Sequence, residues 1–317
     1  MAVPYNTTVT GTNIRDALGG HLRIKQGGTW QHAEDVQVKH SGSWRDTKEV
    51  WVKHSGSWRL VHQGEHFLFN AELTSNSTSE WSLASYLSGQ GYSSGPIKGA
   101  VQIKSQVKRR QINLGNFSGD SLIYLRVDPN CRIQAKGGNG GNAGGGNNPG
   151  GGNGQNGQRA LYSKTNFILD NAGIIAGGGG GGSGGQNSNH TYPVQQSNSC
   201  MKGNTCYEQN FVTVFVPGGG GGGGAGYPNS TGGSGGEQSN KGGNGTSNSF
   251  GSGGGAASGG TSHGGGDGGS LGENGQNTPG PGNRGTAGAA IEGINYRVQN
   301  NQWGDGTGDL RGPTTNS

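Results

Sequence analysis

Glycine recurs at every third residue through long parts of residues 137–293, and this register limits what the chain can fold into. The segment holds 55 of the 73 glycines of the chain. The longest register runs through Gly233, Gly236, Gly242, Gly245, Gly251, Gly254, Gly260, Gly266, Gly269, Gly272 and Gly275. Glycine has no side chain to bury and loses more backbone entropy on folding than any other residue. The backbone itself must therefore be the packing surface, unless the segment is a flexible linker.

Three residues per turn is the period of the polyproline II helix, which has no internal hydrogen bonds. A glycine on each turn leaves one bare stripe, where a neighbouring backbone can come close. Collagen does not fit, because a strict Gly-X-Y repeat and a high proline content are absent; the chain has 10 prolines. The register favours a bundle of polyglycine II helices, hydrogen-bonded helix to helix, over a flexible linker. Apolar segments at residues 165–168, 211–216 and 287–294 interrupt the glycine runs as short strands.

Apolar residues other than glycine gather before residue 135, and only 27% of the chain is hydrophobic. We therefore expect a mainly β N-terminal part, a bundle or sandwich of polyglycine II helices with intervening loops, and little α-helix. The expected divisions are a hairpin-repeat attachment region (1–66), a small antiparallel β domain (67–135), the polyglycine domain (136–294) and a tail (295–317). Alternating apolar residues predict the antiparallel sheet of residues 67–134, with a turn at Asp128-Pro129-Asn130.

An eight-residue sequence, Val-Lys-His-Ser-Gly-Ser-Trp-Arg, occurs at residues 38–45 and again, unchanged, at residues 52–59. A degenerate copy stands at residues 24–30, again 14 residues away. Each unit is typical of a β-hairpin, with a Gly-containing turn before a strand that begins with tryptophan. Three equivalent units suit docking on a threefold-symmetric partner. Trp30, Trp44 and Trp58 are the candidate attachment residues, and they could equally form the core of a small β domain.

The segments between glycine runs are polar and carry isolated aromatic residues. Residues 186–209 form the longest expected loop; other loops are residues 227–231, 246–250 and 256–263. Loops that hold tyrosine, asparagine and serine on a rigid frame are typical of recognition surfaces. The candidate binding residues are His190, Tyr192, Tyr207, Tyr227, Phe250 and His263. Each loop could also be a plain turn, although residues 186–209 are longer than a turn needs.

Cysteine and histidine give weak signals in this chain. Cys200 and Cys206 could close a disulfide across a short loop, or stay reduced in a protein made in a cytosol. Cys131 lies in an apolar strand, and we expect it to be buried as a small hydrophobic residue. Six histidines precede residue 67, but their spacing matches no recognised metal motif, and we expect neither a metal nor a cofactor.

Several function classes lack support in the sequence. The net charge of +5 is partly local, and there is no repeated Arg-Gly-Gly, so we expect no nucleic-acid partner. The first residues show no secretory signal, no run is long enough to span a membrane, and we expect no membrane insertion. No nucleophile, zinc-protease or phosphate-loop motif is present, and the acidic residues of the glycine-rich half are scattered. We therefore expect a protein without enzymatic activity.

Several stretches resemble the glycine-rich distal adhesins of bacteriophage long tail fibres. Residues 171–176 leading into Gly177, and residues 211–217 leading into Gly218, look like the strand-to-polyglycine junctions of that family. Residues 289–293 are similar to its closing strand, so the motifs cover about residues 131–310.

The resemblance implies a sandwich of polyglycine II helices and an N-terminal part, residues 1–135 here, that attaches to a trimeric tail fibre or tail-tip protein. It implies that loops between glycine motifs bind a bacterial receptor, often an outer-membrane protein. It also implies a place at the fibre tip of the virion, after synthesis in the host cytoplasm. The alternative is an ice-binding or structural polyglycine-bundle protein, since polyglycine II bundles also occur in ice-binding proteins.

Overall fold

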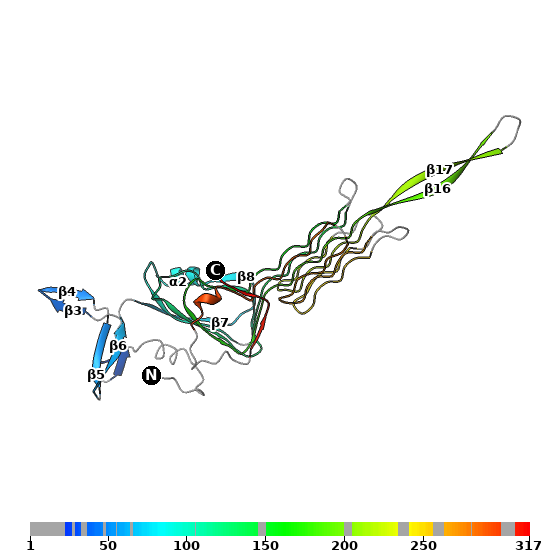
Figure 1. Ribbon diagram of the computed structural model, residues 1–317. Helices are drawn as coiled ribbons and strands as arrows, with labels where there is room; N and C mark the ends of the chain where they lie inside the picture. The colour runs from blue at the N-terminus through cyan, green and yellow to red at the C-terminus, as the bar shows by residue number, and fades with distance from the viewer. Residues whose placement is uncertain are drawn as a thin grey trace.

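The computed structural model describes residues 23–26, 29–32, 37–46, 49–54, 56–63, 66–104, 106–144, 150–199, 205–233, 241–255, 263–279, 281–298 and 308–317. Figure 1 shows an elongated molecule. Small N-terminal hairpins lie at one end, a β-rich part follows, and extended glycine runs lead from it to a long hairpin at the other end. No helix of these described residues is long and apolar enough to cross a membrane.

The N-terminal repeats fold as three antiparallel hairpins, which confirms the prediction. They pair β1 (Arg23–Gln26) with β2 (Thr29–His32), β3 (Gln37–His40) with β4 (Ser43–Asp46), and β5 (Glu49–His54) with β6 (Ser57–Gln63). Ser41 and Gly42 have φ angles of 51° and 85°. Two consecutive positive φ values are those of a type I′ turn, whose twist matches the strands it joins.

Two parallel sheets follow, and we call them together the β unit. The first sheet contains β7 (Phe67–Leu73), β9 (Ile97–Ile103), β11 (Leu122–Val127) and β14 (Phe167–Asn171). The second contains β8 (Ser77–Ser82), β10 (Lys108–Asn113), β12 (Arg132–Gln134), β13 (Leu161–Tyr162), β15 (Ile174–Ala176), β18 (Ile291–Glu292), β19 (Asp309–Arg311) and β20 (Thr314–Thr315). From β7 to β12 successive strands alternate between the two sheets, so this part of the chain winds as a parallel solenoid. Later in the chain, β12 and β13, and then β18, β19 and β20, follow one another within the second sheet.

The predicted antiparallel pairing of residues 67–134 is wrong. β7, β9, β11 and β14 all pair in parallel. The alternation of apolar and polar residues has the same period of two in either direction, so it cannot tell the two pairings apart. The turn at Asp128-Pro129-Asn130 is present, closed by a hydrogen bond from Cys131 N–H to the Asp128 carbonyl (3.1 Å). It carries the chain from β11 into the other sheet and forms no hairpin.

The hydrophobic core lies between the two sheets and is continuous from Phe69 to Ile291. Strands that follow residue 135, such as β14 and β15, contribute to it as fully as the earlier ones. Cys131 is buried within it, as expected, and burial raises the pKa of its thiol. The helix α2 (Leu83–Gly89) packs on this core through Leu83 and Leu87, and a short 3₁₀ helix, η1, spans Ile294–Tyr296.

Ten extended runs of the described chain make up a second part, which we call the glycine unit. They cover residues 136–144, 151–158, 177–185, 218–226, 231–233, 241–246, 251–255, 263–271, 273–279 and 282–289. Strands β12 and β15 lead out into runs, and other runs lead back into β13 and β18. The runs therefore go alternately away from the β unit and back toward it (Figure 1).

Two runs, 177–185 and 218–226, lie inside, and we call them the inner runs. In run 177–185 the backbone N–H donors follow a period of three, so that every third N–H reaches the same neighbouring run. Gly178, Gly181 and Gly184 donate to carbonyl groups of run 151–158. Gly179, Gly182 and Gly185 donate to run 218–226, and Gly180 and Ser183 donate to run 273–279. Carbonyl groups of the same run accept from residues 138–144, 266–272 and 285–288. Among the described runs it thus has six neighbours, and run 218–226 likewise has six. The other eight, the outer runs, form a closed ring around these two.

This arrangement explains where glycine is needed. The glycines of the inner runs face neighbouring backbones: a Cβ added at Gly179, Gly182 or Gly224 would lie about 2 Å from a carbonyl oxygen. Both inner runs are accordingly glycine but for Ser183 and Ala225. An outer run needs glycine mainly where it faces inward, as at the buried Gly282, Gly285 and Gly288. Asparagine often fills the outward positions and accepts an N–H group of the next run, for example from Thr286 to Asn156 Oδ1 (2.9 Å).

Candidate functional site

A long two-stranded hairpin projects from the end of the glycine unit that lies away from the β unit (Figure 1). Its strands are β16 (Ser188–Ser199) and β17 (Thr205–Val216), paired in an antiparallel register over twelve residues. We call these two strands the ribbon. It joins the two inner runs, and its root is fixed by hydrogen bonds from Gly218 N–H to Asn187 Oδ1 and from His263 N–H to the Gln186 carbonyl (both 3.2 Å).

The ribbon exposes apolar side chains on both of its faces. Residues directly opposite each other share a face, so Tyr192, Val212 and Val214 lie on one, and Phe211 and Phe215 on the other. Phe211 is 69% exposed, and Tyr192, Val194, Val212, Val214 and Phe215 are 37–41% exposed, whereas Val216 at the ribbon root is buried. Thr191 and Thr213, opposite each other between the two phenylalanines, are bonded through their hydroxyl groups (2.9 Å). A contiguous exposed apolar surface of this kind marks an interaction site more often than a monomer surface.

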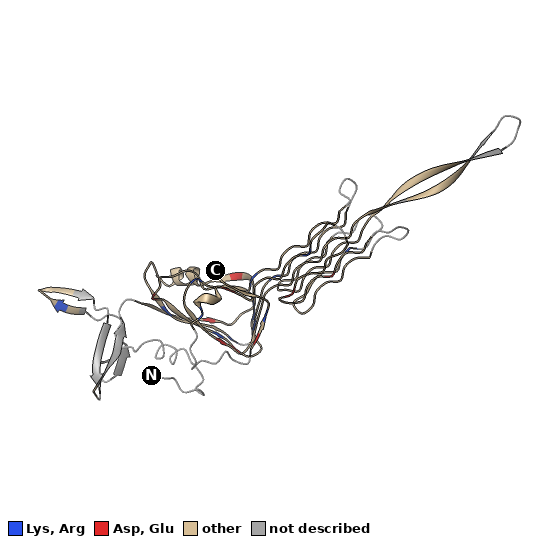
Figure 2. Ribbon diagram, viewed as in Figure 1, with Lys and Arg blue, Asp and Glu red and all other residues tan. Residues whose placement is uncertain are grey.

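Charge is nearly absent from this surface. Glu208 is the one charged residue in the sequence of β16 and β17. Figure 2 shows Lys, Arg, Asp and Glu mainly over the β unit, with none coloured on the part of the ribbon that is drawn in tan. This surface therefore offers apolar contact and hydrogen bonding and almost no charge.

The structure replaces the predicted loop of residues 186–209 with the ribbon. Four of the candidate residues lie at this distal end: His190, Tyr192 and Tyr207 belong to the ribbon strands, and His263 is exposed beside the ribbon root. Cys200 and the side chain of Cys206 lie outside the described residues, as does most of the predicted loop 256–263. The expected disulfide thus remains a prediction.

Two candidate residues lie at the opposite end of the glycine unit. Tyr227 donates its backbone N–H to the carbonyl of Ala135, directly after β12 (3.0 Å). Phe250 ends a loop whose Asn248 side chain accepts a hydrogen bond from Arg132 of β12 (2.9 Å). A run of nine residues at about 3.1 Å per residue places these two about 25 Å from the ribbon root. They cannot form one site with Tyr192 and His263.

The sequence reading missed the main apolar residues of this end. Val194, Phe211, Val212, Val214 and Phe215 are all exposed in the ribbon. The sequence predicts residues 211–216 as a short strand, or a packing end, that closes off a set of glycine runs. Residues 218–224 are seven glycines, so the chain that follows this strand offers no side chains for it to pack against. This feature of the sequence indicates that the apolar side chains of the strand are exposed.

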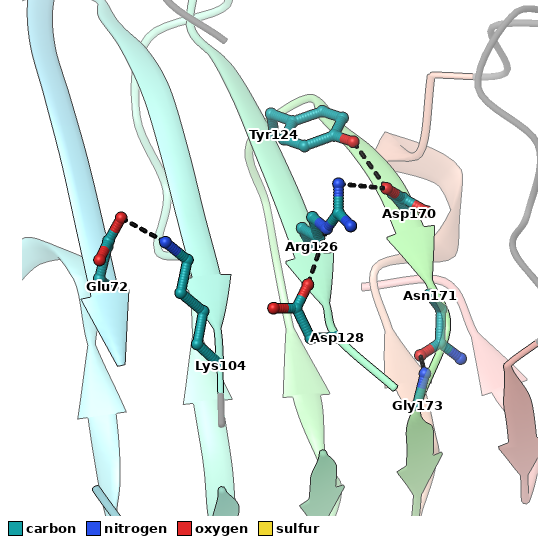
Figure 3. Close-up of polar contacts among 8 residues, drawn as sticks. All are labelled: Glu72, Lys104, Tyr124, Arg126, Asp128, Asp170, Asn171 and Gly173. Carbon is teal, nitrogen blue, oxygen red and sulfur yellow. Dashed lines mark hydrogen bonds and ion pairs between the residues drawn. The ribbon is translucent and has the colours of Figure 1, made fainter. Parts of the chain in front are cut away.

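Among the described residues, a set of interacting charges lies on the outer face of the first sheet (Figure 3). Arg126 contacts Asp128 (2.7 Å) and Asp170 (3.7 Å), and Asp170 accepts a hydrogen bond from the Tyr124 hydroxyl (2.8 Å). Burial, and then the Asp170 carboxylate, raises the pKa of Tyr124 above its usual value. Lys104 and Glu72 form a separate pair on the same face (2.6 Å). Each carboxylate here has a donor, as in a structural ion-pair network, and no group of His, Cys, Asp or Glu within the described chain could hold a metal.

The candidate attachment residues occupy equivalent places in the three hairpins. Trp30, Trp44 and Trp58 stand directly opposite Lys25, Lys39 and Lys53. Trp44 is 65% exposed, and the Lys39 ammonium lies 5.9 Å from the centre of its ring, a cation–π distance. The side chains of Trp30 and Trp58 lie outside those that the structure describes. Trp44 is therefore not a core residue of its hairpin.

Comparison with known proteins places the chain in a family. The family model of the phage tail fibre adhesin Gp38 matches residues 69–315, which is most of the chain and covers the β unit, the glycine unit and the ribbon. The three N-terminal hairpins precede the matched residues. No match was found among curated proteins or among solved structures. The chain therefore belongs to the phage tail fibre adhesins of the Gp38 family, virion proteins that bind a receptor on the host cell.

Proposed function

We propose that this adhesin binds an outer-membrane receptor through its distal end, with the ribbon as the main contact and His190, Tyr192, Tyr207 and His263 within the contact surface. The observation that carries the proposal is the exposed apolar ribbon at the end of the molecule opposite the N-terminal hairpins (Figure 1). A receptor-binding tip must present its contact surface beyond the part that is fixed to the fibre. Tyr227 and Phe250 stand beside the β unit and are left out of this surface.

The proposal includes a rigid support for the ribbon. The ten runs are interpreted as polyglycine II helices. The support for this is the three-residue period of their hydrogen bonds and the six neighbours of each inner run. Backbone amides satisfied in this way leave no flexible hinge between the β unit and the ribbon root. A contact surface that is already ordered loses less entropy on binding.

The other end of the molecule would attach to the fibre. Residues 1–66 carry the hairpin repeats, and we assign Trp30, Trp44 and Trp58 to contacts with a trimeric tail fibre. Support comes from the three equivalent hairpins and from the exposed Trp44 ring. Three copies of one motif in a single chain can meet three identical subunits, one motif per subunit.

The test is binding of the purified full-length protein to a panel of bacterial strains, compared with a variant in which residues 189–215 are replaced by a Gly-Ser turn. We expect the intact protein to bind some strains and not others, and the variant to lose that binding. Thermal unfolding should be unchanged in the variant, because the ribbon strands pair only with each other within the described chain. Binding that survives removal of the ribbon would overturn the proposed site. A folded protein that binds no strain would favour a structural or ice-binding role.

A further inference from the structure

The two edges of the ribbon differ in how well an additional strand could hydrogen-bond to them. A strand at the edge of a sheet presents unpaired N–H and carbonyl groups, which can pair with another chain. In the described structure the ribbon is a two-stranded sheet, so both of its edges are of this kind. Isolated two-stranded hairpins are only marginally stable in water, whereas a third strand stabilises them.

Proline defines which backbone groups point outward. Pro193 lies directly opposite Phe211. Proline has no N–H group, so its position must be one whose N–H would point away from the partner strand. Directly opposite residues alternate between inward and outward pairs. Gln209, Phe211, Thr213 and Phe215 of β17 therefore direct their N–H and carbonyl groups to the open edge, and Thr191 does so on the β16 edge.

Only the β17 edge is free of features that block pairing. The β16 edge is interrupted by Pro193, which offers no donor. From Gln209 to Val216 the β17 sequence has no proline and no charge, and residues 209–215 are all exposed. Charges and prolines are the usual protection of an edge strand, and their absence over seven residues is the signature of a strand that accepts a partner.

We infer that the β17 edge binds an extended strand of the receptor by strand addition, so the receptor is recognised as a protein and not as a glycan. This rests on the proposed function. The added strand would be uncharged along the contact, because the ribbon offers no charged group between residues 209 and 216 to complement one. Its side chains would be apolar or β-branched on both faces, to cover Phe211 and Phe215 on one and Val212 and Val214 on the other.

A second copy of the chain fits this edge less well. Antiparallel pairing of two β17 edges would point the two molecules in opposite directions. Their N-terminal hairpins would then lie far apart, beyond opposite ends of the pair (Figure 1). Two adhesins fixed through those hairpins on fibres of one virion cannot approach a cell in that orientation. A strand of the receptor meets no such constraint.

The experiment compares two proline variants of the full-length protein, Thr213→Pro and Thr191→Pro. Both remove the same Thr191–Thr213 hydrogen bond, and each removes one outward N–H, on the β17 and the β16 edge respectively. The probe is outer-membrane vesicles from a strain that the unaltered protein binds, untreated, protease-treated or periodate-treated. We expect Thr213→Pro to weaken binding at least tenfold, Thr191→Pro to weaken binding at least fivefold less than Thr213→Pro does, and protease but not periodate treatment of the vesicles to remove binding.

Each other outcome overturns the inference. Equal losses in the two variants would mean that the ribbon is recognised through its faces or its overall shape. No loss in either variant would mean that its backbone is not used. Loss after periodate alone would identify a glycan receptor. Concentration-dependent dimerisation that Thr213→Pro abolishes, with vesicle binding intact, would identify a second copy as the occupant. If the unaltered protein binds no strain at all, the proposed function itself fails.

Discussion

At the scale of single residues, the inner glycines differ sharply from the exposed ones. A Cβ at Gly182 would lie 2.0 Å from the carbonyl oxygen of Gly266, whereas a Cβ at Gly119 would meet nothing within 4 Å. We expect Gly182→Ala to lower the free energy of unfolding by about 1–3 kcal/mol or more, through forced displacement of a packed backbone. Gly119→Ala should raise it by about 0.4–1 kcal/mol, because alanine restricts the unfolded chain.

Chemical denaturation of the two glycine variants and the unaltered protein measures this difference. The comparison is matched, because both variants add one methyl group and differ only in what surrounds it. Equal stability of the two variants would contradict the close packing of the inner runs. It would also remove the reason for the almost unbroken glycine of residues 177–185.

Asparagine acts at the residue scale on the outside of the glycine unit. Asn153 and Asn156 accept the N–H groups of Asn283 and Thr286 (2.8 and 2.9 Å), so they bond one outer run to the next. Asn156→Ala should cost about 0.5–1.5 kcal/mol of stability, the usual net value of a hydrogen bond. Asn156→Asp keeps the accepting oxygen and should cost less. If denaturation shows the aspartate variant to be as unstable as the alanine variant, the asparagine oxygen is not the stabilising group.

At the scale of elements, the features that could be predicted are those whose local sequence is typical of a single structure. Two of the three hairpins followed from the repeated Lys-His-Ser-Gly-Ser-Trp, because a Ser-Gly pair before a strand is typical of a turn with positive φ, as Ser41 and Gly42 have. The first hairpin followed from the degenerate copy at residues 24–30, with a Gly-Gly pair at the turn. The burial of Cys131 and the turn at residues 128–130 followed from equally local signals.

Features that depend on distant partners could not be read in the same way. The direction of strand pairing in the first sheet is set by the return path through the second sheet, and nothing within β7 or β9 encodes it. Tyr192 and Tyr227 looked equivalent in sequence, because both are aromatic residues between glycine runs. They lie at opposite ends of the glycine unit because successive runs go alternately away from the β unit and back toward it. A period of three gives no sign of that order.

At the scale of the whole molecule, the N-terminal hairpins and the ribbon lie at opposite ends (Figure 1). The glycine unit between them uses few large side chains, so its loops and its ribbon can change in sequence without disturbing a hydrophobic core. The β unit supplies that core instead, with strands drawn from residues 67–73 as well as 291–292. This division would allow the contact surface for the cell to vary while the attached end stays constant.

The attachment end gives the last prediction. Removal of residues 38–51 deletes one period of 14 residues and joins Gln37 to Val52, which leaves two hairpins of unaltered sequence at their turns. If each hairpin meets one subunit of a trimeric fibre, loss of one hairpin should abolish stable attachment, because the remaining contacts no longer match the symmetry of the partner. Co-sedimentation with purified tail fibres measures attachment, and binding to bacterial cells serves as the control.

Binding to cells should be unchanged in this deletion variant, because the deleted residues precede the part that matches the adhesin family and lie at the end opposite the ribbon. Trp44→Ala is the matched point variant: it keeps all three hairpins and removes an exposed aromatic ring. Attachment that survives the deletion but is lost with the tryptophan would mean that one hairpin alone makes the contact. Attachment that survives both changes would assign the fibre contact to the β unit, since that is the other part of the chain at this end of the glycine runs.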